Sequence, residues 1–436
     1  MLTRLLTGAA CAALMGLAAP ALAASDPQNS GAAIQLAPAA AQAIDAFYAS
    51  HSGAPLWLAD GPNSVAANDL IAILERASLD GFPQGPEIAA RAQAMIAAAQ
   101  SGDPAALNAA DRLLSTAWIE YVQALQRPTP GMTYADYWVK PRQQGAMEIL
   151  QRTAAAPILS TYVQSVSEVN PLYAQLRDAA WNQMQAGGSL DPRVLTSLER
   201  AREMPLQHKY VMVDAAAARL YMIQDGRIVD SMRVAVGKPG ESTQTPMLAS
   251  TIYYATVNPY WHVDPELVRT LIAKNVLDRG LGYLEQQGYQ VMPADESDNS
   301  ILDPATIDWH AVADGSLKVR VRELPGPRNS MGRVKFGFPN QYDIYLHDTP
   351  VKGVFASDDR TISHGCIRLE DAQRLEQWLM DGSEPDTTAA EQQVPLPSPV
   401  PIYVTYLTAQ AHNGEISYID DIYGRDSQAT QVAALK

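Results

Sequence analysis

The hydrophobic period of this chain changes from helical to strand-like near His208, and this change limits the folds open to it. Before His208, apolar residues recur at helical spacing, as in Leu107, Leu114, Trp118, Tyr121 and Leu125. After it, short apolar or alternating runs predict strands, and Asp225-Gly226 predicts a hairpin between two of them. The pattern favours an α+β multidomain fold, in which an all-α domain precedes a β-rich domain of sandwich or barrel class.

The helical domain is expected over residues 39–187, with a linker at 188–207 and a β-rich domain at 208–426. Ser64 is the predicted N-cap of a helix that carries Leu70 and Leu74, and Asp80-Gly81 should end it. The predicted strands include the runs Val211 to Val213, Leu220 to Ile223, Ile228 to Val236, Thr251 to Val257, Lys318 to Leu324, Val334 to Phe338 and Tyr342 to His347. A late pair, Ile402 to Leu407 and Glu415 to Ile419, is split by Asn413-Gly414.

An insert at about 261–314 interrupts the predicted strands. It contains a helical run from Pro265 to Leu277 and an irregular stretch. A long insert in a β-rich domain is often a lid or a binding element, so we expect that role here.

The first 23 residues predict export. Arg4 precedes an apolar stretch from Ala9 to Leu22, and Ala21-Leu22-Ala23 is a small-residue cleavage site, as in a secretory signal peptide. Lipidation at Cys11 is disfavoured, because the apolar run before it is too short. Cleavage would leave a soluble chain of 413 residues (436 − 23), beginning with a linker at 24–38 and ending with a tail at 427–436.

The net charge of the chain and the lengths of its apolar runs argue against two classes of partner, nucleic acid and the membrane interior. The formal charge is −15 with no basic tract, which argues against nucleic acid. No run after the signal peptide approaches the ~18 apolar residues of a membrane span, so no transmembrane anchor is expected.

Export would leave Cys366 as the only thiol of the two in the sequence. A single thiol cannot form an internal disulfide, and its persistence in an oxidising compartment suggests a chemical role. Cys366 lies in Ser363-His364-Gly365-Cys366-Ile367-Arg368, and His347 is nineteen residues upstream (366 − 347). A base, a small residue beside the nucleophile and a nearby cation suit thiol acyl transfer. The alternative is a buried structural cysteine beside incidental histidines.

These residues resemble a known active-site signature. His347-Asp348-Thr349-Pro350, followed after a gap by the Ser363–Arg368 segment, resembles the signature of the L,D-transpeptidases with a YkuD-type catalytic domain. Asn258-Pro259-Tyr260-Trp261 and the stretch from Leu324 to Arg333 resemble the larger, YcbB-like group, in which a helical scaffold domain precedes a catalytic domain with an inserted capping subdomain. Only residues 186–204 separate the two predicted domains, too few for the peptidoglycan-binding module that this group often carries.

The resemblance assigns roles to the signature. Cys366 would be the nucleophile and His347 the general base, and the backbone N–H groups of Gly365 and Cys366 would form the oxyanion hole. In the resembled family, the backbone carbonyl of the residue after the histidine orients its ring, and that residue here is Asp348. The alternative is that the carboxylate of Asp348 orients His347. His364 is a supporting residue that shapes the pocket, assists proton transfer or simply packs.

Four further side chains are candidate substrate ligands: Arg368, Arg360, Ser363 and Trp261. Arg368 suits a substrate carboxylate, although an ion pair with Glu370 or Asp371 is the structural alternative, and Arg360 has the same ambiguity. Trp261 either lines the site or packs in a core. The remaining histidines show no metal-ligand spacing, so neither a metal nor another cofactor is expected.

The resemblance implies a periplasmic enzyme that acts on peptidoglycan stem peptides. A tetrapeptide donor would acylate Cys366, and an acceptor stem would take the acyl group to give a 3→3 cross-link. Water, a free D-amino acid or an envelope protein are alternative acceptors that the signature leaves open. The non-enzymatic alternative is a wall-binding scaffold with an inactive site.

Overall fold

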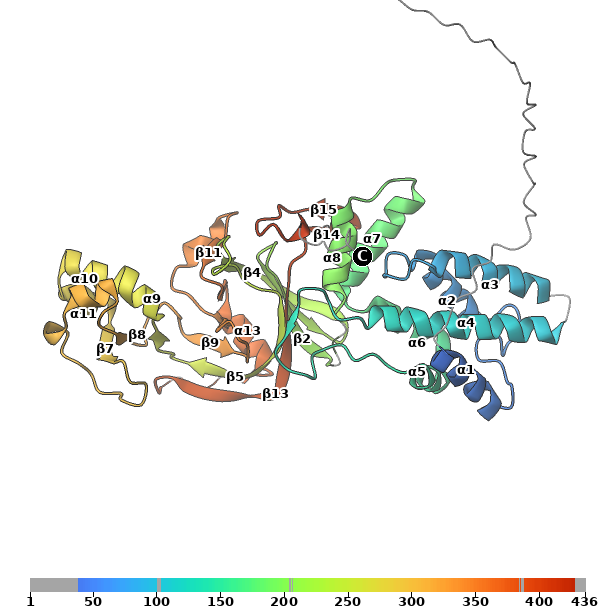
Figure 1. The fold of residues 1–436 in the computed structure, drawn as a ribbon, viewed down its shortest axis with the longest axis horizontal. Helices are drawn as coiled ribbons and strands as arrows, with labels where there is room; N and C mark the ends of the chain where they lie inside the picture. The colour runs from blue at the N-terminus through green and yellow to red at the C-terminus, as the bar shows by residue number, and fades with distance from the viewer. Residues whose placement is uncertain are drawn as a thin grey trace, which may run out of the picture.

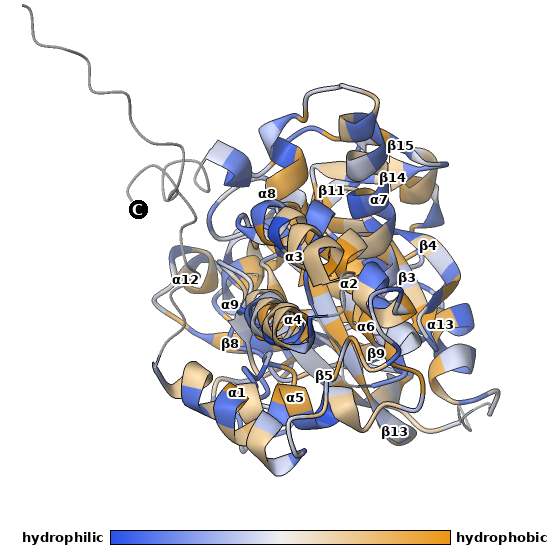
Figure 2. Ribbon diagram, turned by 90° about the vertical axis from the view of Figure 1, so that its right-hand side faces the viewer, coloured by the Kyte–Doolittle hydropathy of each residue, from blue (hydrophilic) through white to orange (hydrophobic). Residues whose placement is uncertain are grey.

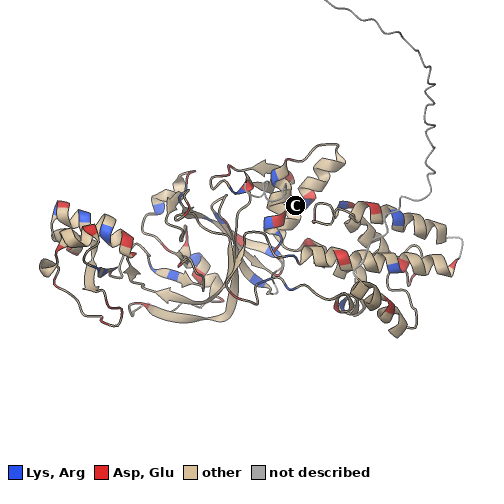
Figure 3. Ribbon diagram, viewed as in Figure 1, with Lys and Arg blue, Asp and Glu red and all other residues tan. Residues whose placement is uncertain are grey.

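The computed structural model describes residues 38–99, 103–203, 205, 207–383, 385 and 388–427. The predicted signal peptide at 1–23, nearly all of the linker at 24–38 and nearly all of the tail at 427–436 lie outside these residues. The molecule is elongated, with helices at one end, a barrel-like sheet in the middle and a small α/β insert at the other end (Figure 1). Acidic and basic residues are interspersed over all three parts (Figure 3). Within the described ranges, no helix has the length and apolar character needed to cross a membrane.

Among the described residues, the N-terminal part consists of seven helices: α1 (Pro38–Ser50), α2 (Val65–Arg76), α3 (Gly85–Ala99), α4 (Pro104–Leu125), α5 (Ala146–Ala154), α6 (Leu159–Glu168) and α7 (Pro171–Gln185). Seen from the helical end, α4 lies between α3 on one side and α1 and α5 on the other (Figure 2). The predicted apolar face of α4 is confirmed, because Leu114, Trp118 and Tyr121 are fully buried in this core. Ser64 caps α2 by accepting a hydrogen bond from the Ala67 N–H, also as predicted.

Two elements differ from the predicted separation into a helical domain, a linker and a β-rich domain. The predicted linker contains a helix, α8 (Pro192–Ala201), which begins because Asp191 accepts a hydrogen bond from the Arg193 N–H and Pro192 has a helical φ angle. A two-residue strand, β1 (Thr133–Tyr134), lies within the helical region and pairs in parallel with β5 (Leu248–Val257). The helical part therefore contributes a strand to the sheet of the second part.

The central sheet closes on itself. Its strands are β5, β13 (Gln392–Thr405), β2 (Lys209–Asp214), β3 (Arg219–Gln224), β4 (Arg227–Gly237), β12 (Ile367–Leu369), β10 (Tyr345–His347) and β9 (Val334–Gly337), in that order, and β9 pairs back onto β5. β11 (Thr361–Ser363) lies beside β4, and α13 (Ala372–Leu379) packs Leu375 and Leu379 onto the core. The predicted Asp225-Gly226 hairpin is confirmed, since both residues have the positive φ angles of a type I′ turn. The predicted α+β class, with a barrel-like β-rich part, is confirmed.

The late hairpin differs from the prediction. Asn413-Gly414 joins β14 (Ala409–His412) to β15 (Glu415–Tyr418), which form a separate two-stranded sheet. The predicted partner run from Ile402 lies largely in β13, between β2 and β5. The run from Ile402 pairs with strands that are distant in sequence. A local turn signal such as Asn413-Gly414 cannot identify those partners.

The insert extends further than predicted. It comprises β6 (Trp261–His262), α9 (Pro265–Leu267), η1 (Val268–Ile272), α10 (Ala273–Arg279), α11 (Gly282–Gln287), β7 (Tyr289–Pro293), η2 (Pro304–Thr306), α12 (Trp309–Asp314) and β8 (Val319–Glu323). The strand predicted at Lys318 to Leu324 is present as β8, but it pairs with β6 and β7 and so belongs to the insert. Val263, Ile272, Trp309 and Val321 belong to a core of the insert's own.

Candidate active site

Cys366, the predicted nucleophile, lies in a tight turn between β11 and β12. Gly365 has a φ of 114°, a backbone conformation that favours glycine. The Ser363 hydroxyl donates to the Cys366 carbonyl at 2.6 Å and accepts from the Gly365 N–H at 3.1 Å. Ser363 therefore closes the turn, which leaves its hydroxyl unsuited to the predicted substrate contact. The Gly365 N–H, which was expected to belong to the oxyanion hole, is likewise bonded within the turn.

The strand register places the predicted base near the nucleophile. β10 and β12 are parallel, with Leu346 opposite Ile367 and His347 opposite Arg368. Leu346 and Ile367 point into the barrel core, where both are fully buried. Because side chains alternate along a strand, His347 and Arg368 point to the other face. Cys366 directly precedes β12 and lies one position back along the same pair of strands, so its backbone is diagonally opposite His347.

One tautomer of His347 is held by the backbone. Its Nδ1 lies 2.6 Å from the backbone carbonyl oxygen of Asp348. A carbonyl only accepts hydrogen bonds, so Nδ1 carries the proton and Nε2 has the free lone pair. The Asp348 carboxylate is occupied elsewhere, since it accepts from the Arg333 N–H at 2.9 Å and from Lys352 Nζ at 2.7 Å. Of the two predicted orienting groups, the structure selects the carbonyl.

Burial keeps the thiol and the imidazole neutral at rest. Burial, followed by the positive charge of Arg368, lowers the pKa of His347 to about 3. Burial also raises the pKa of the Cys366 thiol, although the Tyr345 N–H and hydroxyl and the charge of Arg368 act in the opposite direction. The neutral thiol points to the Asp343 carbonyl, 3.9 Å from Sγ. At neutral pH the resting pair is therefore a thiol and a neutral imidazole.

Arg368 is a cation of this site that forms no ion pair with another described residue. Its Nε is buried without a hydrogen-bond partner among the described residues. Glu370 instead accepts from Arg233 Nε at 2.9 Å, and Asp371 lies 3.8 Å from Arg374 Nε. The alternative ion pairs of Arg368 are thus not formed, and its charge acts on both Cys366 and His347.

The other predicted ligands are placed differently. Arg360 donates to the backbone carbonyls of Val234, Ser357 and Ala217, so its guanidinium ties β4 to the loops beside it. Trp261 packs in the insert, with its ring centroid 6.4 Å from that of Tyr289. Both side chains are thus engaged in contacts within the protein.

His364 is exposed at the outer side of the turn, so the packing role is not the one the structure gives it. Within the described ranges, no three His, Cys, Asp or Glu side chains are grouped as a metal site would require.

Sequence reasoning missed two residues on the face that carries His347. Tyr345, two residues before His347, presents its N–H and hydroxyl to the thiol. Lys335 lies opposite His347 on β9, and its Nζ is 6.0 Å from the centre of the Tyr345 ring. The period of two in the predicted strand would have identified Tyr345. Lys335 depends on register between strands, which the sequence alone does not specify.

Two sequence families match the chain. Residues 208–402 match the L,D-transpeptidase catalytic domain, YkuD, and residues 42–179 match the Scaffold domain. A Haemophilus influenzae protein named "Putative L,D-transpeptidase" is 27% identical over 396 residues, which are 88% of this chain and 78% of that protein.

Solved L,D-transpeptidases are more distant. The enzyme from Mycobacterium smegmatis is 16% identical, with a TM-score of 0.23, over 45% of this chain and 58% of that one. L,D-transpeptidase 3 from Mycobacterium tuberculosis, solved with a faropenem-derived adduct, is 15% identical, with a TM-score of 0.22, over 45% of this chain and 60% of that one. This chain thus spans less than two thirds of either solved chain.

Proposed function

Because the chain belongs to the L,D-transpeptidases that join a scaffold domain to a YkuD-type catalytic domain, we propose that it forms 3→3 cross-links in peptidoglycan through a thioester on Cys366. The arrangement of His347 supports this proposal most directly. Its Nδ1–H is held by the Asp348 carbonyl, so Nε2 is left as a base on β10, the strand beside the one that Cys366 precedes. The proposed substrates are stem peptides, and the proposed location is the periplasm.

The first half-reaction acylates the enzyme. His347 Nε2 takes the proton of the Cys366 thiol, and Sγ attacks the carbonyl of the L-centre of diaminopimelate in a tetrapeptide donor. The Cys366 N–H donates to the oxyanion that develops on this carbonyl. The bond to the terminal D-alanine then breaks, and the imidazolium returns its proton to the leaving amine. The products are D-alanine and a thioester.

The second half-reaction transfers the acyl group. An amine of the acceptor stem attacks the thioester carbonyl and loses a proton to His347. The carbon–sulfur bond breaks, and the thiolate recovers that proton from the imidazolium. The new amide joins two diaminopimelate residues as a 3→3 cross-link. Water or a free D-amino acid as acceptor would instead give a tripeptide or an exchanged tetrapeptide, and a protein amine would attach that protein to the wall.

Substrate binding should strengthen the base. The charge of Arg368 is the second cause of the low pKa of His347. A donor carboxylate bound to Arg368 would neutralise that charge and raise the pKa of the imidazole toward its usual range. The base would then become effective when the donor is in place, which limits unproductive thiol chemistry in the free enzyme.

Mass spectrometry of purified muropeptides incubated with the mature protein tests the proposal. We expect cross-linked dimers and free D-alanine from tetrapeptide donors, and neither product from a Cys366→Ala protein. Tripeptides or exchanged tetrapeptides without dimers would assign a different acceptor. Dimers formed equally by wild-type and Cys366→Ala proteins would refute the thioester.

A further inference from the structure

The peptide unit between Gly365 and Cys366 is held by a hydrogen bond from a buried residue, Thr245. Thr245 is fully buried, and its hydroxyl donates to the Gly365 carbonyl at 2.8 Å. The same hydroxyl accepts from the Gly237 N–H at 2.9 Å, which fixes the direction of its own proton. In a trans peptide the C=O and the following N–H point in opposite directions. Because Thr245 holds the carbonyl toward the core, the Cys366 N–H points away from the core.

The backbone around Thr245 is packed too closely to move independently of the turn. A Cβ at Gly237 would lie 2.0 Å from the Thr243 carbonyl oxygen and 2.7 Å from the Thr245 nitrogen, so only glycine fits there. The Lys238 N–H donates to the Ser363 carbonyl at 3.0 Å, which joins the same segment to β11. A displacement of Thr245 would therefore change the orientation of the nucleophile turn.

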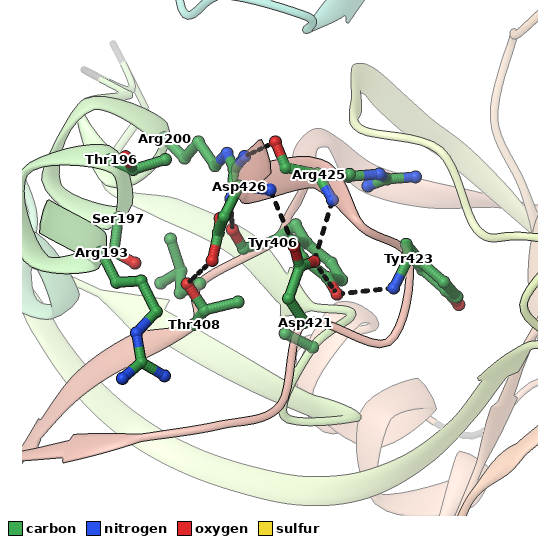
Figure 4. A network of polar contacts seen from close by, with 12 residues as sticks. Arg193, Thr196, Ser197, Arg200, Tyr406, Thr408, Asp421, Tyr423, Arg425 and Asp426 are labelled. Atoms are coloured by element: carbon green, nitrogen blue, oxygen red, sulfur yellow. Dashed lines mark hydrogen bonds and ion pairs between the residues drawn. The ribbon is translucent and has the colours of Figure 1, made fainter. Parts of the chain in front are cut away.

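Residues of the C-terminal segment form hydrogen bonds with Thr245 and with its neighbours Gly237 and Gln244. The Tyr423 hydroxyl donates to the Gly237 carbonyl at 2.7 Å, and Arg425 donates to the Thr245 carbonyl at 2.8 Å and to the Gln244 side chain at 3.0 Å. Asp421 orders this segment by accepting from the backbone N–H groups of Arg425 and Asp426, as Figure 4 shows. We call residues 421–426 the C-terminal latch.

The other end of the latch is attached to α8. Arg200 donates to the Asp426 carboxylate at 2.6 Å and to the Arg425 carbonyl at 2.9 Å (Figure 4). Thr408 donates to the same carboxylate at 2.6 Å. Arg200 and Asp426 are largely buried, which makes this ion pair less subject to screening than a surface one. A continuous set of hydrogen bonds thus runs from α8, through the latch and Thr245, to the Gly365 carbonyl.

We propose that Thr245, held in place by the C-terminal latch, is a positioning residue that directs the Cys366 N–H at the oxyanion of the tetrahedral intermediate. This inference rests on the proposed function, because it concerns a step of that reaction. It assigns a role to the latch that is separate from holding the fold together. Without the Thr245 hydroxyl, the Gly365–Cys366 peptide can rotate, since Gly365 tolerates many backbone conformations.

The test compares two reactions of the same thiol. Acylation by a tetrapeptide donor needs an oxyanion donor, whereas alkylation by iodoacetamide displaces iodide at a saturated carbon and forms no oxyanion. We expect Thr245→Val to reduce the single-turnover acylation rate by about 10–100-fold, less than the ~10²–10³-fold cost of removing such a donor outright. The rate and pH profile of alkylation should stay unchanged. Thr245→Ser restores the hydroxyl and should recover most of the acylation rate.

Two further variants complete the test. Thr251→Val is the matched control, because Thr251 is also fully buried and its hydroxyl has no hydrogen-bond partner among the described residues. It should leave both reactions unchanged. Tyr423→Phe removes both hydrogen bonds of the Tyr423 hydroxyl, which donates to the Gly237 carbonyl and accepts from the Thr245 N–H at 3.4 Å. It keeps the ring stacked on Tyr406 at 5.2 Å and should lower acylation alone. It decides the question if Thr245→Val fails to fold.

The outcomes separate this inference from the proposed function. Wild-type acylation rates in Thr245→Val, or an equal fall in acylation and alkylation, would overturn the positioning role. If Thr245→Val is unfolded, unchanged acylation in Tyr423→Phe overturns it. No acylation of the wild-type protein by any stem peptide would instead refute the proposed function.

Discussion

The thiol of Cys366 is half-buried against the barrel core, where an alanine methyl group can replace it with little loss of packing. We therefore expect Cys366→Ala to keep the melting temperature within a few degrees of the wild type and to lose all acyl transfer. A carbapenem, whose strained ring is opened by the same attack, should add its mass to the wild-type protein. Intact-protein mass spectrometry checks this, and an equal mass increase on Cys366→Ala would exclude Cys366 as the acylated residue.

The two histidines near the thiol differ in burial and should differ in function. His347 is buried and bonded to the Asp348 carbonyl, whereas His364 is exposed. We expect His347→Ala to slow single-turnover acylation by ~10²–10⁴-fold, the usual contribution of a general base. His364→Ala is the control in the same active-site region and should cost much less. The reverse order of rates would exchange the two roles.

The pKa shifts of the resting pair predict a simple pH dependence. The raised pKa of Cys366 and the pKa of about 3 for His347 mean that neutral thiol predominates near pH 7. Alkylation by iodoacetamide should therefore accelerate continuously as pH rises toward and through the thiol pKa. An already ionised thiolate–imidazolium pair would give a plateau at neutral pH. Stopped-flow or quench measurement of the alkylation rate from pH 5 to 10 distinguishes these two states.

The same shift of His347 predicts acid sensitivity. Its folded pKa, about 3, is below the ordinary value of 6.5, so the unfolded chain binds the proton more readily. The stabilising contribution of neutral His347 is present above about pH 6.5 and is lost as pH falls toward 3. His347→Gln removes this titration, and its free energy of unfolding should fall less than that of the wild type over this interval. Parallel urea titrations at several pH values would show no difference if the imidazole were protonated in the folded state.

At the scale of elements, the chain enters and leaves the insert at the paired ends of β5 and β9. β5 and β9 are antiparallel neighbours whose last register pair is Val257 with Val334, and the Asn258 N–H donates to the Arg333 carbonyl at 2.8 Å. Replacing residues 259–332 by a short glycine-containing turn would convert β5 and β9 into an ordinary hairpin. Since the insert has its own core, the barrel core should remain intact.

We expect this loop-replacement variant to bind the tetrapeptide donor at least about tenfold more weakly. A tenfold loss of affinity corresponds to ~1.4 kcal/mol of binding free energy. The reason is the position of the insert's base, where His262 reaches Glu391 at 3.3 Å and Glu391 reaches Lys335 at 3.7 Å, next to His347 in register. Iodoacetamide alkylation of Cys366 is the control and should persist. Unchanged donor kinetics in a folded variant would contradict a substrate-binding role for the insert.

At the scale of the whole molecule, α7 and α8 share a core with the β14–β15 hairpin, which follows the last barrel strand in the chain. Tyr173 of α7 and Val194 and Leu198 of α8 pack with Leu407 and Ala409, which lie beside β14 and in it. A truncated chain that begins at residue 170 keeps this cluster, whereas one that begins at residue 208 exposes it. Each buried Val or Leu side chain contributes about 1.5–3 kcal/mol, so the shorter chain should melt at a clearly lower temperature.

Calorimetry of the two truncated chains checks this expectation. Neither retains β1, so the comparison isolates the contribution of α7, α8 and the Arg200–Asp426 ion pair. Equal melting temperatures would show that the helices and the barrel are independently stable.

Local patterns in the sequence determined the two-part layout and the chemically reactive residues. Side-chain period distinguishes helix from strand, a Ser before an apolar run marks a cap, and Asp225-Gly226 marks a tight turn, because each depends on neighbours along the chain. The signature around Cys366 and His347 is likewise local, so the sequence alone is enough to propose a nucleophile and a base.

Tertiary structure decided the contacts between residues that are distant in sequence. It engaged the Gly365 N–H with Ser363, assigned the Arg360 guanidinium to backbone carbonyls, and paired β8 within the insert. It also brought Thr245 into contact with Gly365, 120 residues away, and Arg200 into contact with Asp426 of the C-terminal latch, 226 residues away. Each hydrogen-bonding group had several possible partners in the sequence, and only packing of the folded chain brought one of them within bonding distance.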